Sequence, residues 1–291
     1  MRVLVLGAGG MLGHKLVQQY RTRYETWTTA RAGYRAYARY GVIDPNRFIP
    51  GVDAFDFDSV IRALATVKPD VVINCIGIIK QLDTAKDPII SIGINALFPH
   101  RLANLCRGAG ARLIHISTDC VFNGRGGMYT EDDPSNAEDL YGRTKFLGEV
   151  SGEGALTLRT SIIGRELSTQ SGLVDWFLSN RGGQVRGFTG AIYTGFTTLA
   201  LADIIAGVID HHPDLTGLYQ VSSEPIDKYT LLCLVRDAYR ADITIEPYAD
   251  FTLDRSLDSS RFREATGFTP PTWETMINAM AADPTPYDEW R

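Results

Sequence analysis

Two patterns of hydrophobic positions alternate along the first 116 residues of the chain. Short runs predict strands at residues 2–6, 25–29, 70–75 and 112–116, and most of these runs are apolar enough to be buried. Apolar residues at helical spacing predict helices at residues 11–20, 60–65 and 92–106, the last interrupted by Pro99. Alternating strands and helices indicate an α/β protein with a doubly wound parallel sheet, the Rossmann fold.

The pattern changes after about residue 165, where glycines at 182, 183, 187 and 190 interrupt it. A helix is predicted at 199–209, a strand at 218–221 and an amphipathic segment at 229–239. We expect a nucleotide-binding Rossmann domain over residues 1–165, to which residues 196–222 return. Residues 166–195 and 223–291 would then form a smaller C-terminal α/β lobe that binds the substrate.

Composition narrows the class of protein further. The net charge of −5 argues against a nucleic-acid partner, which would require a basic surface. No run approaches the roughly 20 apolar residues of a membrane span, and the first apolar run is too short for a signal peptide. The four cysteines are widely separated and lack metal-ligand spacing, so we expect free buried thiols, no metal and a cytoplasmic location.

A glycine-rich turn follows the first strand. Gly7, Gly10 and Gly13 are spaced three apart, and Met11 and Leu12 begin the predicted helix. A strand that turns sharply into a helix presents backbone amides to a pyrophosphate, and side chains at the turn would block that approach. These five residues are therefore predicted to bind a dinucleotide.

The residues after the second strand bear on the choice of cofactor. An acidic residue there would bind the ribose 2′-hydroxyl of NAD, but this chain has Ala30-Arg31. Arg31 can pair with a 2′-phosphate, so NADPH is favoured, with NADH and a merely solvated basic loop as alternatives. Asp56, followed by Phe57, is predicted either to accept a hydrogen bond from adenine or to cap a helix.

Polar and small residues follow two further strands. Cys75, Ile76 and Gly77 come after the strand at 70–75, and Thr118, Asp119 and Cys120 come after the strand at 112–116. Carboxyl ends of parallel strands face the ligand crevice, so both groups are predicted to line it. There Gly77 would leave room for the cofactor or merely begin a turn. Thr118 would donate to a substrate carbonyl or serve a turn.

Tyr141 and Lys145 lie four residues apart, which places both on one face of a helix. A free tyrosine has a pKa of about 10, and a nearby lysine cation would lower it enough for proton transfer. The same lysine could hold the nicotinamide ribose. In isolation, a packed tyrosine and a surface lysine would be the better explanation of the pair, but the order and context of the other motifs favour the catalytic one.

Taken together, these motifs resemble the extended short-chain dehydrogenase/reductase superfamily, and within it the dTDP-4-dehydrorhamnose reductases. The resemblance rests on residues 5–13, 71–74, 109–119, 121–124, 141–145 and 158–161. It implies hydride transfer to the 4-keto group of a nucleotide-linked 4-keto-6-deoxy sugar. Tyr141 would protonate the alkoxide, Thr118 would hydrogen-bond it and Lys145 would tune Tyr141. Asn95 would be the superfamily's proton-relay asparagine, beside the cofactor.

Two departures concern the sugar pocket. The family usually has tyrosine where this chain has Cys120, and an aromatic residue where it has Ile162. With Thr118 and Asp119, both are predicted to contact the sugar, which need not be rhamnose. A sugar-nucleotide epimerase is an alternative, as is a non-catalytic NADP-binding protein similar to the regulatory subunit of methionine adenosyltransferase. A homodimer is the oligomer that the resemblance suggests.

Overall fold

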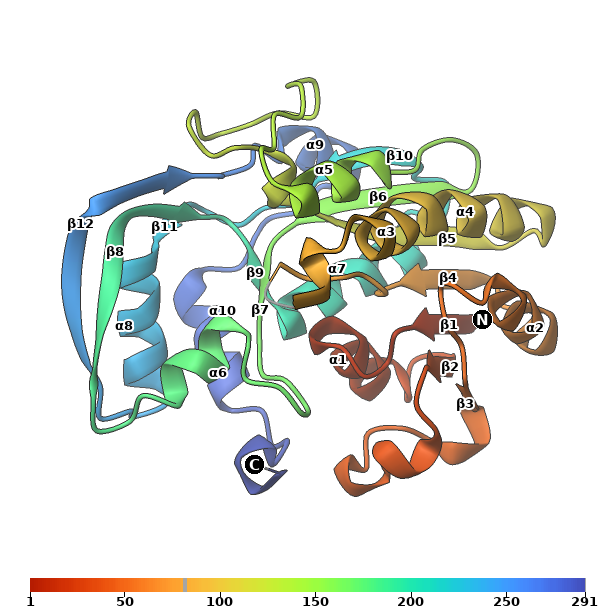
Figure 1. The fold of residues 1–291 in the computed structure, drawn as a ribbon, viewed down its shortest axis with the longest axis horizontal. Helices are drawn as coiled ribbons and strands as arrows, with labels where there is room; N and C mark the ends of the chain where they lie inside the picture. Colours follow the sequence, from red (N-terminus) through yellow and green to blue (C-terminus); the bar gives the residue numbers. More distant parts are fainter. Residues whose placement is uncertain (81–82, 291) are drawn as a thin grey trace.

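A seven-stranded sheet forms the centre of the molecule (Figure 1). The computed structural model describes residues 1–80 and 83–290. Neighbouring strands are parallel throughout, in the order β10-β6-β5-β4-β1-β2-β3. The strands are β1 Arg2–Leu6, β2 Glu25–Ala30, β3 Phe48–Pro50, β4 Val71–Asn74, β5 Arg112–Thr118, β6 Ala155–Thr160 and β10 Gly217–Gln220. The order reverses between β1 and β4, which confirms the predicted doubly wound Rossmann fold.

Helices cover both faces of this sheet. On one face, α1 (Met11–Tyr20) and α7 (Thr198–His211) pack with Val3 and Val5 in one buried cluster. On the other, α2 (Phe57–Val67) and α4 (Phe98–Gly108) pack over Leu4 and Leu6, with α3 (Pro88–Ser91) and α5 (Leu140–Leu147) nearby. A π-helical turn, Ile92–Leu97, joins α3 to α4, where one long helix was predicted. Pro99 stands in the first turn of α4, where a missing N–H is tolerated.

A smaller lobe lies beyond the carboxyl ends of the strands, on the left of Figure 1. Its sheet has the order β11-β8-β12, in which β12 runs parallel to β8. The strands are β8 Gln184–Tyr193, β11 Ile226–Asp227 and β12 Thr244–Asp254, and a separate pair joins β7 Ile162–Ile163 to β9 Phe196–Thr197. The remaining helices are α6 Leu173–Leu178, α8 Lys228–Ala238, α9 Ser260–Thr266 and α10 Trp273–Ala281.

Residues 283–290 run back along α1 and contact its polar side chains. Lys15 Nζ lies 2.5 Å from Asp283 Oδ2 in an ion pair that is almost fully buried. The Nε2 atom of His14 is 2.7 Å from the hydroxyl of Tyr287, and its Nδ1 is 2.9 Å from the carbonyl oxygen of Gly10. This segment therefore braces the helix that follows the glycine-rich turn.

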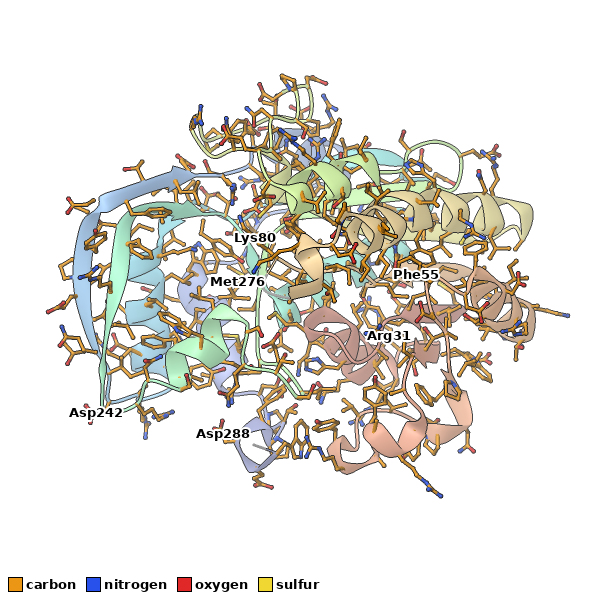
Figure 2. All side chains as sticks on the ribbon, viewed as in Figure 1. Arg31, Phe55, Lys80, Asp242, Met276 and Asp288 are labelled. Carbon is orange, nitrogen blue, oxygen red and sulfur yellow. The ribbon has the colours of Figure 1, made fainter. Side chains whose placement is uncertain are left out.

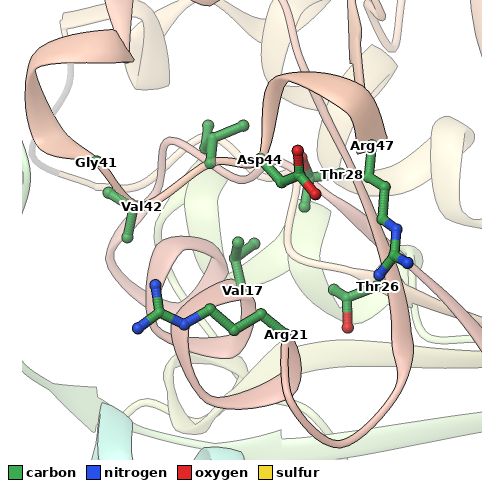
Figure 3. Close-up of a pocket in the computed structure, with 9 residues that line it drawn as sticks. Val17, Arg21, Thr26, Thr28, Gly41, Val42, Asp44 and Arg47 are labelled. Atoms are coloured by element: carbon green, nitrogen blue, oxygen red, sulfur yellow. The ribbon is translucent and has the colours of Figure 1, made fainter.

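A small cavity of about 160 Å³ lies between α1, β2 and residues 41–47 (Figure 3). Its lining includes Arg21, Thr28 and Arg47 but none of the residues predicted to bind the cofactor or the sugar. In residues 1–80 and 83–290 no helix has the length and apolar character needed to cross a membrane.

Candidate cofactor and catalytic site

The turn between β1 and α1 requires glycine at two of the predicted positions. Gly7 has a φ of +86°, in the left-handed region that other residues rarely adopt. A Cβ atom on Gly13 would lie 2.2 Å from the carbonyl oxygen of Gly7. Gly10 precedes the helix and makes no side-chain capping bond, so the first amides of α1 remain available to a phosphate. Of the two residues that begin α1, Leu12 is buried in the core, while the Met11 side chain lies against Gly172 of the lobe.

The end of β4 lies directly beside this turn. A Cβ atom on Gly7 would be 3.2 Å from both the Cys75 carbonyl and the Ile76 side chain. On Gly77 it would be 3.5 Å from Asn95 Oδ1. Asn95 is buried in the π-helical turn and holds both the N–H and the carbonyl of Ile78, at 2.9 and 3.1 Å. The structure thus brings these predicted cofactor residues together, and π-helical turns are frequent at functional sites.

The predicted 2′-phosphate ligand follows β2. Arg31 is exposed and lies beside the tip of β1 on the side of the sheet that faces the lobe (Figure 2). Burial raises the pKa of the nearby Tyr37, and the Arg31 cation opposes that rise. The Tyr37 ring also lies against Gly9 of the turn, because a Cβ atom there would be 2.8 Å from it. Arg31 therefore borders the glycine-rich turn.

Asp56 and Phe57 begin α2 at the same edge of the sheet. Asp56 stands at the capping position but makes no side-chain capping bond, so the helix-cap interpretation is not realised. Its exposed carboxylate is 3.4 Å from Arg62. The Phe57 ring packs edge-on against Phe98, with the Arg101 guanidinium 4.0 Å from its centre.

The predicted catalytic residues Thr118 and Tyr141 lie close together at the end of β5. Thr118 Oγ1 accepts from the Cys120 backbone at 3.2 Å and lies 3.1 Å from Asp119 Oδ1. The Tyr141 side chain lies close enough to Thr118 for the threonine to lower the pKa of the phenol. Helix α5 packs so closely here that a Cβ atom on Gly142 would lie 2.1 Å from the Cys120 carbonyl oxygen. Glycine next to the tyrosine therefore allows α5 to pack closely against the end of β5.

Burial dominates the electrostatics of Tyr141 and Lys145. It raises the pKa of Tyr141 above its ordinary value, and Asp119 and Cys120 raise it further, so the phenol keeps its proton at neutral pH. The predicted lowering of this pKa by Lys145 is not among its main influences. Lys145 Nζ instead donates to the Ile116 carbonyl at 2.8 Å, and burial lowers the lysine pKa to about 8.

The lobe adds two cations that the sequence analysis missed. Arg255 donates to the Phe122 carbonyl at 2.8 Å, and its Nη1 lies 3.6 Å from Cys120 Sγ. Lys228, the first residue of α8, faces Asp119 and Cys120, and burial lowers its pKa. Both lie more than 100 residues from Thr118 in sequence and no local motif marks either, so only the tertiary fold reveals them.

Two further predictions concern Ile162, expected near the sugar, and the four cysteines, expected to be buried free thiols. Ile162 is half-buried in β7, pairs with Phe196 and packs against the main core. All four cysteines are free, but only Cys106 is fully buried, so the expectation of buried thiols is wrong for the other three. Within the described residues no group of three or more His, Cys, Asp or Glu side chains is arranged to hold a metal ion.

A Rossmann sheet with a threonine, a tyrosine and a lysine at the end of β5 is the architecture of an extended short-chain dehydrogenase/reductase. The family model described as "RmlD substrate binding domain" matches residues 1–285. The chain belongs to this family.

Three known proteins illustrate the similarity. A dTDP-4-dehydrorhamnose reductase of Streptomyces griseus is 34% identical over 149 residues, which cover 51% of this chain but only 43% of that protein. Methionine adenosyltransferase 2 subunit beta of Xenopus tropicalis is 25% identical over 95% of this chain and 80% of its own length. The crystal structure of dTDP-4-dehydrorhamnose reductase from Bacillus anthracis in complex with NADP has a TM-score of 0.76 at 22% identity, covering 96% of this chain and 98% of that one.

Proposed function

We propose that this protein is an oxidoreductase that uses NADPH to reduce the 4-keto group of a nucleotide-linked 4-keto-6-deoxy sugar, in the synthesis of deoxysugars for cell-surface polysaccharides. The observation that carries the proposal is the proximity of the Thr118 and Tyr141 side chains at the carboxyl end of β5, with Lys145 one turn along α5. Family membership and the similarity to a named reductase support it.

The residues around the glycine-rich turn fit a dinucleotide. Free amides at the start of α1 and the crowding at Gly13 suit a pyrophosphate held against the backbone. This surface continues through Cys75, Ile76 and Gly77 toward Lys145. The lysine is near enough for its charge to lower the pKa of the Cys75 thiol. The absence of a carboxylate after β2, together with the position of Arg31, supports NADPH over NADH.

The described side chains can complete a carbonyl reduction. A bound nicotinamide supplies the hydride to the carbonyl carbon. Tyr141, which keeps its proton at neutral pH, donates it to the developing alkoxide, and Thr118 donates a hydrogen bond to the same oxygen. Lys228 and Arg255 place two cations near Asp119, which suits a substrate with a diphosphate.

The test is to mix the purified protein with NADPH and a panel of 4-keto sugar nucleotides and to follow NADPH absorbance. We expect oxidation with at least one of them. Tyr141→Phe should reduce turnover at least 100-fold while leaving NADPH affinity nearly unchanged, because general acid catalysis contributes about 10²–10⁴-fold. Tight NADPH binding without oxidation of NADPH in the presence of any of these sugar nucleotides would reject the reductase.

A non-catalytic regulatory role is a second candidate. It is favoured by the match to methionine adenosyltransferase 2 subunit beta, which extends over 95% of this chain. A mixture of the purified protein with a methionine adenosyltransferase catalytic subunit, analysed by size-exclusion chromatography with and without NADPH, distinguishes the two. A stable complex together with no NADPH oxidation would favour this second role.

A further inference from the structure

A buried cluster of charged and polar residues lies behind Lys145, and the proposed reaction does not use it directly. Glu149 accepts two hydrogen bonds from Arg159, from Nε to Oε1 and from Nη2 to Oε2, both at 2.7 Å. Ser117 donates a third to Oε1 at 2.7 Å. The side chains of Arg159 and Glu149 are only 3% and 8% exposed, so water screens this ion pair weakly.

The cluster shares β5 and α5 with the proposed catalytic residues. Lys145 donates to the carbonyl of Ile116, and the next residue, Ser117, holds Glu149. Tyr141, Lys145 and Glu149 are spaced four apart, although α5 ends at Leu147 and Glu149 lies just beyond it. The carboxylate is therefore fixed from two strands, β5 and β6, just beyond the helix that carries the lysine.

We propose that Glu149 is a positioning residue that acts through Lys145: clamped by Arg159 and Ser117, it keeps the lysine ammonium charged in a buried site. The proposal rests on the proposed function, because a charged Lys145 matters only where it helps to hold the cofactor. It concerns a residue that does not itself touch the substrate.

The surroundings of Lys145 explain why this role falls to Glu149. The lysine is 6% exposed, and burial lowers its pKa to about 8. Glu149 is the strongest influence that raises that pKa, followed by Cys75. Burial raises the Cys75 pKa to about 12, so at neutral pH this group is an uncharged thiol. His115 on β5 is also neutral there, because burial and Lys145 lower its pKa.

The guanidinium of Arg159 offsets part of the Glu149 charge. Arg159 is held in a bidentate pair by Glu149, and it is not among the groups that shift the pKa of Lys145. The π-helical turn Ile92–Leu97, which packs against α5, carries no titratable side chain. In the described part of the chain, Glu149 is thus the carboxylate that holds Lys145 in its charged form.

Loss of the Glu149 charge should shift the titration of Lys145 to lower pH. Lys145 is charged below its pKa of about 8 and neutral above it. Removing the Glu149 charge lowers that pKa further, so the charged form is lost at a lower pH. By Coulomb's law across one helical turn, the shift is roughly one pH unit or more.

The experiment follows the ε-carbon resonance of Lys145 by NMR as a function of pH, in full-length protein labelled with ¹³C-lysine. Lys145→Arg identifies the resonance. We expect a midpoint near 8 in the wild type, about one unit lower in Glu149→Gln, and close to wild type in Glu149→Asp. The matched control is Glu131→Gln, which removes another carboxylate whose side chain is only 4% exposed, and it should leave the midpoint unchanged.

A folded Glu149→Gln variant with the wild-type midpoint would overturn the proposal. If that variant does not fold, because Arg159 loses its buried partner, the pair Glu149→Gln with Arg159→Gln is titrated instead, and an unchanged midpoint again overturns it. The alkaline limb of NADPH oxidation should move with the NMR midpoint. Since the titration needs no substrate, a protein that reduces no 4-keto sugar rejects the proposed function and still gives a separate result for Glu149.

Discussion

Adding a single methyl group should have opposite effects at two glycines of this fold. In Gly13→Ala the new Cβ atom would lie 2.2 Å from the Gly7 carbonyl oxygen and 2.9 Å from its carbonyl carbon. Both are backbone atoms, so no flexible side chain can move aside, and the turn must open by about 1 Å to reach ordinary contact distance. Overpacking of this kind costs about 1–3 kcal/mol, and the backbone contact places Gly13 at the upper end.

Gly207 supplies the matched control. It lies inside α7, and a Cβ atom there would meet nothing within 4 Å. Gly207→Ala should therefore stabilise the protein by about 0.5–1 kcal/mol, because alanine loses less backbone entropy in a helix.

Thermal unfolding and NADPH titration measure both variants. With roughly 2–4 °C per kcal/mol for a domain of this size, we expect Gly13→Ala to lower the melting temperature by about 6–12 °C and Gly207→Ala to raise it by about 1–4 °C. Displaced amides at the start of α1 should also weaken NADPH binding at least 10-fold in the first variant only. Wild-type stability and NADPH affinity in Gly13→Ala would refute the assigned geometry of the turn.

Three further substitutions test other parts of the molecule. Arg31→Ala should weaken NADPH binding by roughly 10–100-fold and leave NADH binding unchanged, since a charged hydrogen bond to a phosphate contributes about 1.5–3 kcal/mol; equal losses for both cofactors would exclude a 2′-phosphate contact. Lys228→Gln should raise the KM for the sugar nucleotide at least 10-fold with little change in NADPH affinity, and an unchanged KM would remove Lys228 from the substrate site. Asp283→Asn should destabilise the fold by about 3–5 kcal/mol in chemical denaturation, because it leaves the buried Lys15 charge unpaired; a loss below 1 kcal/mol would contradict this.

The sequence predicted the first half of the fold well because its strands are short apolar runs buried on both faces. The predictions for β1 and α1 agree with the structure at every boundary. In the lobe, β12 has no regular alternation of buried and exposed residues, so it gives no period-two pattern and was not predicted. Its parallel partner β8 precedes it by about 60 residues, a pairing that local patterns do not indicate.

The candidate site also has features that local motifs predict and features that depend on the tertiary fold. Gly7, Gly13, Thr118 and Tyr141 belong to compact motifs whose spacing implies their geometry. The raised pKa of Tyr141 depends on burial and on Asp119, and neither is visible without the tertiary structure.

The contacts between α1 and residues 283–290 also affect how the chain folds during synthesis. The Lys15–Asp283 and His14–Tyr287 pairs join positions 268 and 273 residues apart. At about 5–20 residues per second, a ribosome needs roughly 13–55 seconds to add that length of chain. Throughout this time the two most buried polar side chains of the helix beside the glycine-rich turn have only their local partners, Gly10 and Gln18. The nucleotide-binding half, although translated first, therefore completes its packing among the latest parts of the molecule.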